Sequence, residues 1–219
     1  MFKRTVIWGI VLVLVLSSAG WSQMVRYKWS PRLNLGAGMV VWSPGGEDRN
    51  LFESSMGLNV SAAYWFKPKT QLVLSVNGGP LAAREDVWFD LLALEESYDE
   101  WDVKGSLWNG SLEIRSLYSA GPKNFMYLGL GADLFYFSTI KASYTIYGTE
   151  QPEEGSIETS RDPDFSFGPH LAPGMFFIFN TPIGDGFIDV GVRFNYLIDG
   201  DNDNPFWLAP YFTGGLRVF

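Results

Sequence analysis

Apolar residues alternate with small or polar residues in eight stretches between Pro31 and the C-terminus, and this period of two constrains the fold more than any other feature. In the clearest stretch, Ile188 to Tyr196, the even-numbered residues are apolar or aromatic, and the odd-numbered ones are Asp, Gly, Arg and Asn. After the N-terminal segment, no apolar run approaches the ~20 residues that a membrane helix needs. The pattern therefore predicts antiparallel strands with one apolar face.

The fifth stretch is the longest of the eight. The parity of Leu128 and Tyr136 continues through Ile140, Ala142 and Ile146, so we expect all these side chains on the apolar face.

Three prolines fall inside predicted strands, where a residue without an N–H cannot donate to the ladder. At Pro169, Pro173 and Pro210 we therefore expect bulges, or strands that begin later than the alternation suggests.

Alternation alone fits two architectures. A soluble β-sandwich would turn the apolar face inward, whereas a membrane β-barrel would turn it toward lipid. The composition, 47% hydrophobic and 16% aromatic without long apolar runs, is typical of the barrel.

The links between stretches alternate in length. The short links are 67–70, 119–124 and 180–186, and the long links are 43–50, 79–104, 138–164 and 198–205. Outer-membrane barrels have short periplasmic turns and long external loops in this order. The link lengths therefore favour the barrel over the sandwich.

Charged and aromatic residues are sorted in the same way. The long links hold 19 of the 24 acidic residues, whereas the short links hold Lys67, Lys69 and Lys123 with the single acid Asp185. Aromatic residues gather at both ends of the strands, which predicts two interfacial belts. The members expected in these belts are Tyr64, Trp65, Phe66, Tyr118, Phe125, Phe177 and Phe179 near the short links, and Trp42, Tyr136, Tyr196, Phe206 and Trp207 near the long links.

The N-terminus has the layout of a secretory signal. Lys3 and Arg4 precede an apolar run from Thr5 to Leu16, and small residues follow. We predict a cleaved signal peptide over 1–22 and a mature domain over 23–219; an uncleaved anchor helix is the alternative. The net charge of −8 argues against nucleic acid as a partner, and the absence of cysteine excludes a disulfide framework.

With this signal, this strand pattern and the terminal Phe219, the chain resembles the small outer-membrane β-barrel families of eight-stranded, OmpA/OmpX-like architecture. The resemblance covers the whole mature chain. It implies an all-β, closed, antiparallel, up-and-down transmembrane barrel in a Gram-negative-type bacterial outer membrane. Eight strands are expected, and ten if the link 87–101 contains its own hairpin.

The resemblance also implies partners. Phe219 would be the signal that the outer-membrane assembly machinery recognises, although Arg217 stands where the families usually have an aromatic or apolar residue. The barrel would contact outer-membrane lipid and lipopolysaccharide. Resemblance of pattern gives architecture and not activity.

The inward parity gathers charge in the lumen, which eight strands leave just wide enough for side chains to fill. Because buried charges must be paired, this set predicts an ion-pair network that plugs the barrel, with a gated pore or polar ligand site as the alternative. Its members are Arg32, Glu113, Arg115, Asp133, Asp189, Arg193 and Arg217, with Asn34, Asn59, Asn77, Asn109 and Asn195 as amide partners.

Candidate catalytic chemistry is sparse. His170 is the single histidine, and Ala172 stands where deacylase-type barrels carry a serine two residues after their histidine. We therefore expect His170 to be a core residue, and we expect no enzyme, no cofactor and no metal site. Three functions remain open: a structural or surface-interaction barrel, a small ion or solute channel, and a lipid-modifying enzyme.

The fourth long link contains alternating carboxylates, Asp199, Asp201 and Asp203, which suit hard cations such as Ca²⁺. The link lacks the glycine and glutamate of a calcium-binding EF-hand loop, so a solvated acidic turn is the simpler interpretation. A surface partner or divalent cations at the loops are possible ligands of the barrel.

Overall fold

The computed structural model describes residues 32–46, 48–84, 87–88, 100–146, 153–158, 164–198 and 206–218. The predicted signal peptide, the acidic turn 199–203 and Phe219 lie outside these residues. Within the described part of the chain, no helix has the length and hydropathy required to cross a membrane.

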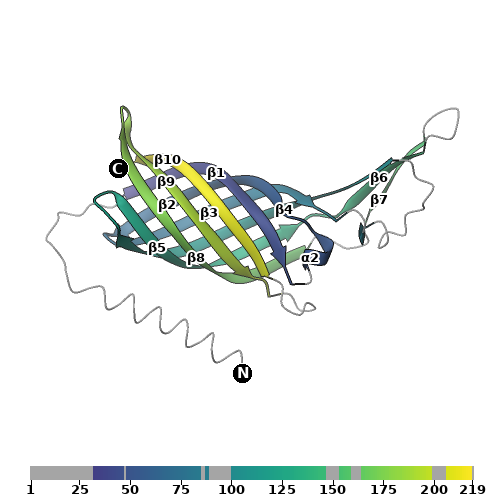
Figure 1. The fold of residues 1–219 in the computed structure, drawn as a ribbon, viewed down its shortest axis with the longest axis horizontal. Helices are drawn as coiled ribbons and strands as arrows, with labels where there is room; N and C mark the ends of the chain where they lie inside the picture. The colour runs from purple at the N-terminus through teal and green to yellow at the C-terminus, as the bar shows by residue number, and fades with distance from the viewer. Residues whose placement is uncertain are drawn as a thin grey trace, which may run out of the picture. The chain divides into compact units, whose positions relative to one another are not determined.

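Eight strands form a closed antiparallel barrel, as the sequence predicts (Figure 1). Hydrogen bonding joins them in the order β3-β2-β1-β10-β9-β8-β5-β4, and pairing of β3 with β4 closes the ring. The barrel strands are β1 (Arg32–Gly45), β2 (Ser55–Lys67), β3 (Thr70–Ala82), β4 (Glu100–Ser119), β5 (Asn124–Phe137), β8 (Asp164–Thr181), β9 (Gly184–Tyr196) and β10 (Phe206–Val218).

Three further elements lie in the long links. The short helix α2 (Asp48–Leu51) follows β1, and the strands β6 (Lys141–Ile146) and β7 (Glu153–Glu158) pair with each other after β5. β6 also pairs with the first residues of β4. The expected alternative of ten barrel strands is wrong, because β3 pairs directly with β4 and the additional hairpin stays outside the ring.

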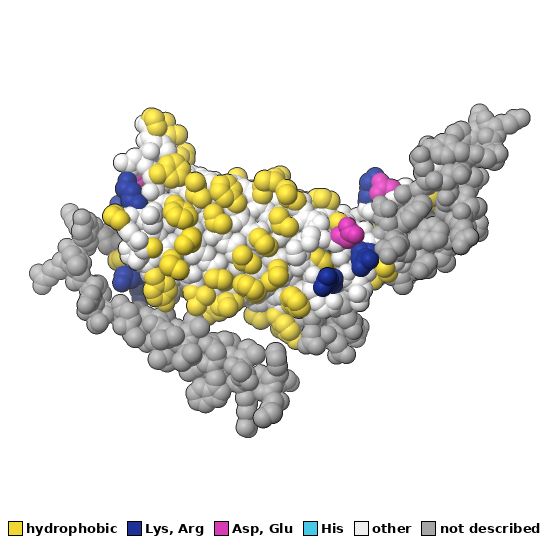
Figure 2. Space-filling model, viewed as in Figure 1, with side chains coloured by type: hydrophobic (Ala, Val, Ile, Leu, Met, Phe, Trp, Pro, Cys, Tyr) yellow, Lys and Arg dark blue, Asp and Glu magenta, His cyan; other side chains and the backbone are white. Residues whose placement is uncertain are grey.

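The apolar face of the barrel is its outer face, so the soluble sandwich is excluded. Leu58 is 70% exposed, and Val60, Leu112 and Phe212 are exposed as well. Figure 2 shows such side chains covering the outside of the barrel. The residues between them point inward and are buried. A belt of this kind is stable against hydrocarbon and costly in water.

The long fifth stretch does not keep one parity. Leu107 of β4 pairs with Phe137 of β5, but Lys104 of β4 pairs with Lys141 of β6, so one extra residue enters between the two strands. Since a one-residue shift exchanges the faces of a strand, Ile140 and Ala142 are buried rather than on the outer face where we expected them.

The prolines cause no register shift, contrary to expectation. The β5–β8 register runs unbroken through Pro169 and Pro173, and the β9–β10 register runs unbroken through Pro210. On their other sides, the β8–β9 pairs begin at His170 and omit Pro173, and the β1–β10 pairs omit Pro210. An antiparallel residue directs its N–H to one neighbour, so each proline weakens a single ladder.

The interior contains an apolar cluster at each end. The long-link cluster consists chiefly of Val40, Trp42, Phe52, Leu81, Trp88, Leu107, Phe135, Ile140, Leu197 and Trp207. The short-turn cluster consists of Trp65, Leu117, Tyr127, Phe176, Ile178 and Phe187, with Phe125 against it.

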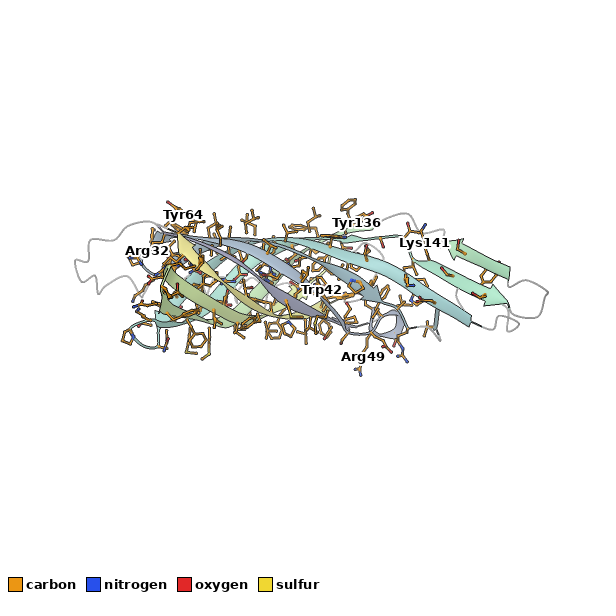
Figure 3. All side chains as sticks on the ribbon, turned by 90° about the horizontal axis from the view of Figure 1, so that it is seen from above. Arg32, Trp42, Arg49, Tyr64, Tyr136 and Lys141 are labelled. Carbon is orange, nitrogen blue, oxygen red and sulfur yellow. The ribbon has the colours of Figure 1, made fainter. Side chains whose placement is uncertain are left out.

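The positions of the aromatic residues correct one expectation. Trp42, Trp65 and Trp207 belong to the interior clusters and are nearly inaccessible, so they do not lie in interfacial belts. Tyr64 and Tyr136 do project away from the barrel, and Trp42 lies within it (Figure 3).

Candidate functional site

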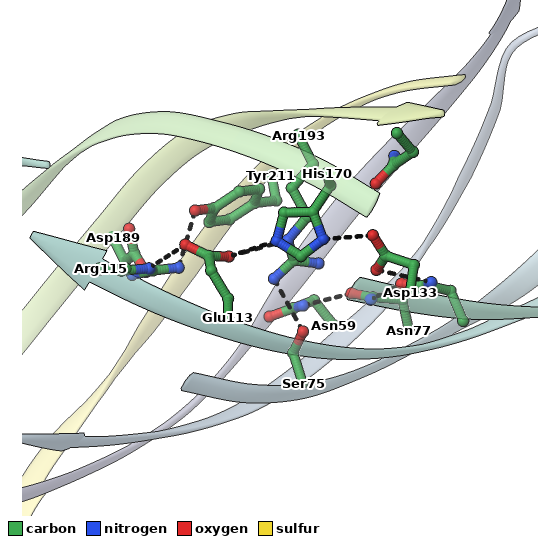
Figure 4. Close-up of polar contacts among 12 residues, drawn as sticks. Asn59, Ser75, Asn77, Glu113, Arg115, Asp133, His170, Asp189, Arg193 and Tyr211 are labelled. Atoms are coloured by element: carbon green, nitrogen blue, oxygen red, sulfur yellow. Dashed lines mark hydrogen bonds and ion pairs between the residues drawn. The ribbon is translucent and has the colours of Figure 1, made fainter. Parts of the chain in front are cut away.

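A network of buried polar side chains lies between the two apolar clusters, and we call it the central polar network (Figure 4). Seven of the eight barrel strands, all except β1, contribute at least one inward polar residue to this network. Its members are Asn59, Ser75, Asn77, Asn109, Glu113, Arg115, Tyr127, Asp133, His170, Asp189, Arg193, Tyr211 and Thr213.

Arg115 has the most polar contacts in this network. Its Nε donates to Oε1 of Glu113 at 2.6 Å, and its Nη1 donates to Oδ2 of Asp189 at 2.5 Å. Nη2 donates to the hydroxyl of Tyr211 at 2.9 Å, and the guanidinium lies 4.2 Å from the ring centre of Tyr127. The side chain of Arg115 is 1% exposed, so its charge is compensated by these two carboxylates rather than by water.

Glu113 and Asp133 flank the imidazole of His170. Oε2 of Glu113 lies 3.3 Å from Nε2 of His170 and 3.5 Å from Nε of Arg193. On the other side, Nδ1 of His170 pairs with Oδ2 of Asp133. Each imidazole nitrogen therefore faces a carboxylate, and the ring links the two acids.

A series of side-chain hydrogen bonds, mostly between asparagine amides, continues the network from strand to strand along the inner face of the barrel. Asn109 donates to Oδ1 of Asp133 at 3.0 Å, and Asn77 donates to Oδ1 of Asn109 at 2.7 Å. Asn59 donates to Asn77, and Thr213 donates to Oδ1 of Asn59 at 2.7 Å. The strand register explains this series, since Asn77 is directly opposite Asn59 on one neighbour and opposite Asn109 on the other.

Glycines on β5, the strand between β4 and β8, make room for the side chains of Glu113 and His170. A Cβ on Gly131 would lie 2.6 Å from Nε2 of His170, and a Cβ on Gly129 would overlap the Glu113 carboxylate. The alternation of glycine with apolar residues in β5 thus leaves inward space for longer side chains of β4 and β8.

The structure separates the seven predicted network residues into two groups. Glu113, Arg115, Asp133, Asp189 and Arg193 come together in the central polar network. Arg32 and Arg217, predicted to join them, lie at the short-turn end instead, because they occupy the first and penultimate residues of the strands that carry them.

The contacts of these two arginines are correspondingly different. Arg32 lies 3.9 Å from Asp185 with a partly exposed side chain. Nε of Arg217 lies 3.3 Å from Oδ1 of Asn34, and its guanidinium lies 5.0 Å from the ring centre of Trp65.

Sequence reasoning did not predict Ser75, Tyr211 and Thr213 as members of the network, and it missed Tyr127 and the role of His170. Tyr127 was not singled out, although it lies on the inward parity of its stretch and donates to Oδ1 of Asp189 at 2.7 Å. His170 was expected as a core residue but not as the link between Glu113 and Asp133. The signal that identifies Tyr127 is an aromatic hydroxyl on the inward face, next to the inward glycines Gly129 and Gly131. The partners of His170 come from strands that no local pattern relates.

The contacts of the central polar network compensate charge between its arginines, its histidine and its carboxylates. Among the described residues, no group of three or more histidine and acidic side chains is arranged to hold a metal ion. The weak cation candidates Asp199, Asp201 and Asp203 lie outside those residues. Both nitrogens of His170 already face carboxylates, so neither is directed at a hydroxyl nucleophile.

No protein-family model matches the chain, and no curated protein matches it. The crystal structure of Neisserial surface protein A is similar over 87% of this chain and 99% of that one, with 14% identity and a TM-score of 0.51. A major outer membrane protein of Thermus thermophilus has 12% identity and a TM-score of 0.48 over 87% of this chain and 100% of its own. Ail, the attachment invasion locus protein of Yersinia pestis, solved with the heparin analogue sucrose octasulfate, has 16% identity and a TM-score of 0.48 over the same shares.

The likeness to Neisserial surface protein A extends to the fold alone, and the exposed apolar belt supplies the second observation. A closed β-barrel satisfies every strand hydrogen bond internally, and its apolar outside suits hydrocarbon. The chain therefore has the architecture and surface of a bacterial outer-membrane β-barrel.

Proposed function

We propose that this outer-membrane β-barrel is a non-conducting, non-enzymatic membrane anchor whose rigid wall presents the long connections at the cell surface. The observation that supports the proposal is the burial of the inward side chains along the barrel. The central polar network lies between the long-link cluster and the short-turn cluster, and the side chains of all three groups are buried. An eight-stranded barrel has little lumen beyond the volume of its inward side chains.

Charge pairing in the network supports a closed lumen. The cations Arg115 and Arg193 each lie against a carboxylate of Glu113 or Asp189, at distances between 2.5 and 3.5 Å. An ion that crossed this layer would have to replace pairs held in a low-dielectric interior, which is costly.

The long-link end supports the same conclusion. Asp48 of α2 accepts a hydrogen bond from Nε1 of Trp207 at 2.6 Å, and Nε1 of Trp88 donates to the carbonyl of Leu51 at 2.8 Å. The ring of Phe52 lies 5.8 Å from that of Trp88 and 6.2 Å from that of Trp207. These contacts hold parts of the first two long links against the barrel interior.

The surface role rests on the distribution of charge. The long links hold 19 of the 24 acidic residues, and the filled barrel fixes where those links begin and end. Acidic surface segments suit divalent cations, which also bridge lipopolysaccharide, or a basic partner. Titration of the refolded barrel with Ca²⁺ tests the cation version. Replacing Asp199, Asp201 and Asp203 by Asn should abolish any heat of binding, and an unchanged titration would refute their role.

Planar-bilayer recording tests the proposal as a whole. Refolded wild-type protein should give no discrete conductance steps at any voltage, while heat-modifiable gel migration of the same vesicles verifies that the barrel has inserted. A double variant, Arg115→Ala with Arg193→Ala, provides the comparison. Steps in the wild type that change in this variant would establish a channel and overturn the plugged anchor.

The enzyme alternative has a separate test. His170→Ala removes the one imidazole of the chain. If the protein is an anchor, cells that produce this variant should have the same outer-membrane lipid profile as cells that produce the wild type. A lipid product that appears with the wild type and is lost with the variant would establish lipid-modifying activity.

A further inference from the structure

The short-turn end of the barrel is positively charged, although the whole chain has a net charge of −8. Apart from the central polar network, the described residues at this end comprise five cations and one acid, Asp185, which is a net charge of +4. We call the cations the basic rim, and they are Arg32, Lys67, Lys69, Lys123 and Arg217. Figure 2 shows Lys and Arg side chains at this end, and others at the opposite end together with Asp and Glu.

The basic rim is spread around the barrel rather than held in one turn. Lys67 and Lys69 lie at the β2–β3 connection, and Lys123 lies at the β4–β5 connection. Arg32 begins β1 and Arg217 lies near the end of β10, which is the neighbour of β1. The three lysines are exposed, so their ammonium groups reach the surroundings of the barrel.

Arg32 of the basic rim lies 3.9 Å from the one acid at this end, Asp185, and two other cations of the rim have neutral partners. Lys123 donates to the amide oxygen of Asn180, a neutral partner. The guanidinium of Arg217 contacts Asn34 and the face of Trp65, which are also neutral.

The apolar belt extends to the same level. Tyr64, Tyr118 and Phe179 are exposed on the outer face near the short turns, and Ile183 at the tip of the β8–β9 turn is 80% exposed. Amphipathic aromatic rings beside long basic side chains mark the depth where hydrocarbon meets lipid headgroups. The basic rim is therefore at headgroup level.

From this juxtaposition we propose that the basic rim binds the phosphate groups of anionic phospholipids in the leaflet that the short turns face. Positive charge at a membrane surface attracts anionic lipid, and guanidinium and ammonium groups both donate strongly to phosphate oxygens. Continuity with the lipid-facing belt favours a lipid phosphate over a soluble one, since the same side chains already border the acyl region. This inference rests on the membrane position of the barrel and is independent of the plugged lumen.

Native mass spectrometry of the full mature chain tests the proposal. The protein is released from mixed micelles of equimolar phosphatidylglycerol and phosphatidylcholine, and the retained lipids are counted. Phosphatidylglycerol should be enriched on the wild type. The triple variant Lys67→Gln, Lys69→Gln and Lys123→Gln should lose this enrichment, by up to about fivefold for each lysine, the factor that corresponds to about 1 kcal/mol.

A matched control lies at the opposite end of the barrel. Lys104→Gln with Lys141→Gln also removes exposed lysines but should leave the enrichment intact. Equal retention of the two lipids by the wild type, or equal losses in the two variants, would overturn the proposal. Heat-modifiable migration and circular dichroism establish that each variant is folded before lipids are counted.

Two further measurements separate the sources of the phosphate. Chloride and inorganic phosphate at equal ionic strength should reduce the enrichment equally, by screening. A much stronger effect of inorganic phosphate would mean that the basic rim is a site for soluble phosphate. If the triple variant keeps its lipid enrichment but loses binding to purified peptidoglycan, the partner is the cell wall and the lipid assignment is wrong.

Discussion

Replacing Arg115 by Met should be among the most destabilising single changes in the barrel. The substitution removes the hydrogen bonds to Glu113 at 2.6 Å, to Asp189 at 2.5 Å and to Tyr211 at 2.9 Å. Glu113 keeps His170 and Arg193 as neighbours, but among the described residues Asp189 keeps only the hydroxyl of Tyr127. Loss of one partner from a buried ion pair costs about 3–5 kcal/mol.

Urea unfolding of the barrel in lipid vesicles, followed by tryptophan fluorescence, measures this loss. With a denaturant slope of about 2 kcal/mol per molar, the midpoint should fall by about 1.5–2.5 M. The matched variant is Arg115→Met with Asp189→Asn, in which the stranded carboxylate becomes a neutral amide. This double variant should be more stable than Arg115→Met alone, because the unpaired charge has been removed.

The reasoning fails on either of two results. A midpoint within about 0.5 M of the wild type would mean that water or rearranged side chains replace Arg115 at little cost, and that the lumen is not sealed. A double variant less stable than Arg115→Met would mean that the Asp189 carboxylate contributes through partners other than Arg115.

Two more predictions concern the outer and inner faces of the wall. Leu112→Arg, in the middle of the lipid-facing belt, should cost about 2–4 kcal/mol in vesicles, whereas Ile183→Arg at the tip of the short turn should cost about 0–1 kcal/mol; equal costs would contradict the assigned membrane position. Gly131→Ala should destabilise the barrel by about 1–3 kcal/mol, because its Cβ would meet His170 and the Leu112 carbonyl. Gly110→Ala on the adjacent strand β4 is the control, since a Cβ there meets nothing within 4 Å, and a similar melting loss in both variants would disprove the steric explanation.

Alternation predicted that each strand has two different faces, and the link lengths and the sorting of charge favoured the barrel over the sandwich, because the two faces of a barrel wall have different solvents. Lipid outside requires apolar residues at every second position, and the narrow lumen requires small or paired polar ones. This is why the parity of Glu113, Arg115, Asp189 and Arg193 predicted their inward position. The alternating link lengths predicted which end carries the short turns for the same local reason, since a tight hairpin needs only a few residues.

Alternation could not locate the breaks in its own pattern. The single extra residue between Phe137 and Lys141 exchanges the faces of β6, and the sequence around it keeps the same apparent parity. The tryptophans near the strand ends were placed wrongly for a different reason. Trp42, Trp65 and Trp207 were assigned to the interfacial belts because they lie where strands end, but each has the inward parity of its strand.

The sequence by itself therefore determined the strand period, the outward apolar face, the link lengths and the set of inward charges. The tertiary structure decided which of those charges meet. His170 of β8 links Glu113 of β4 to Asp133 of β5, while Arg32 and Arg217 lie at the rim with other partners. The physical reason is that side-chain parity is fixed within a strand, whereas height along the barrel axis is fixed by register and strand tilt, which belong to the closed ring as a whole.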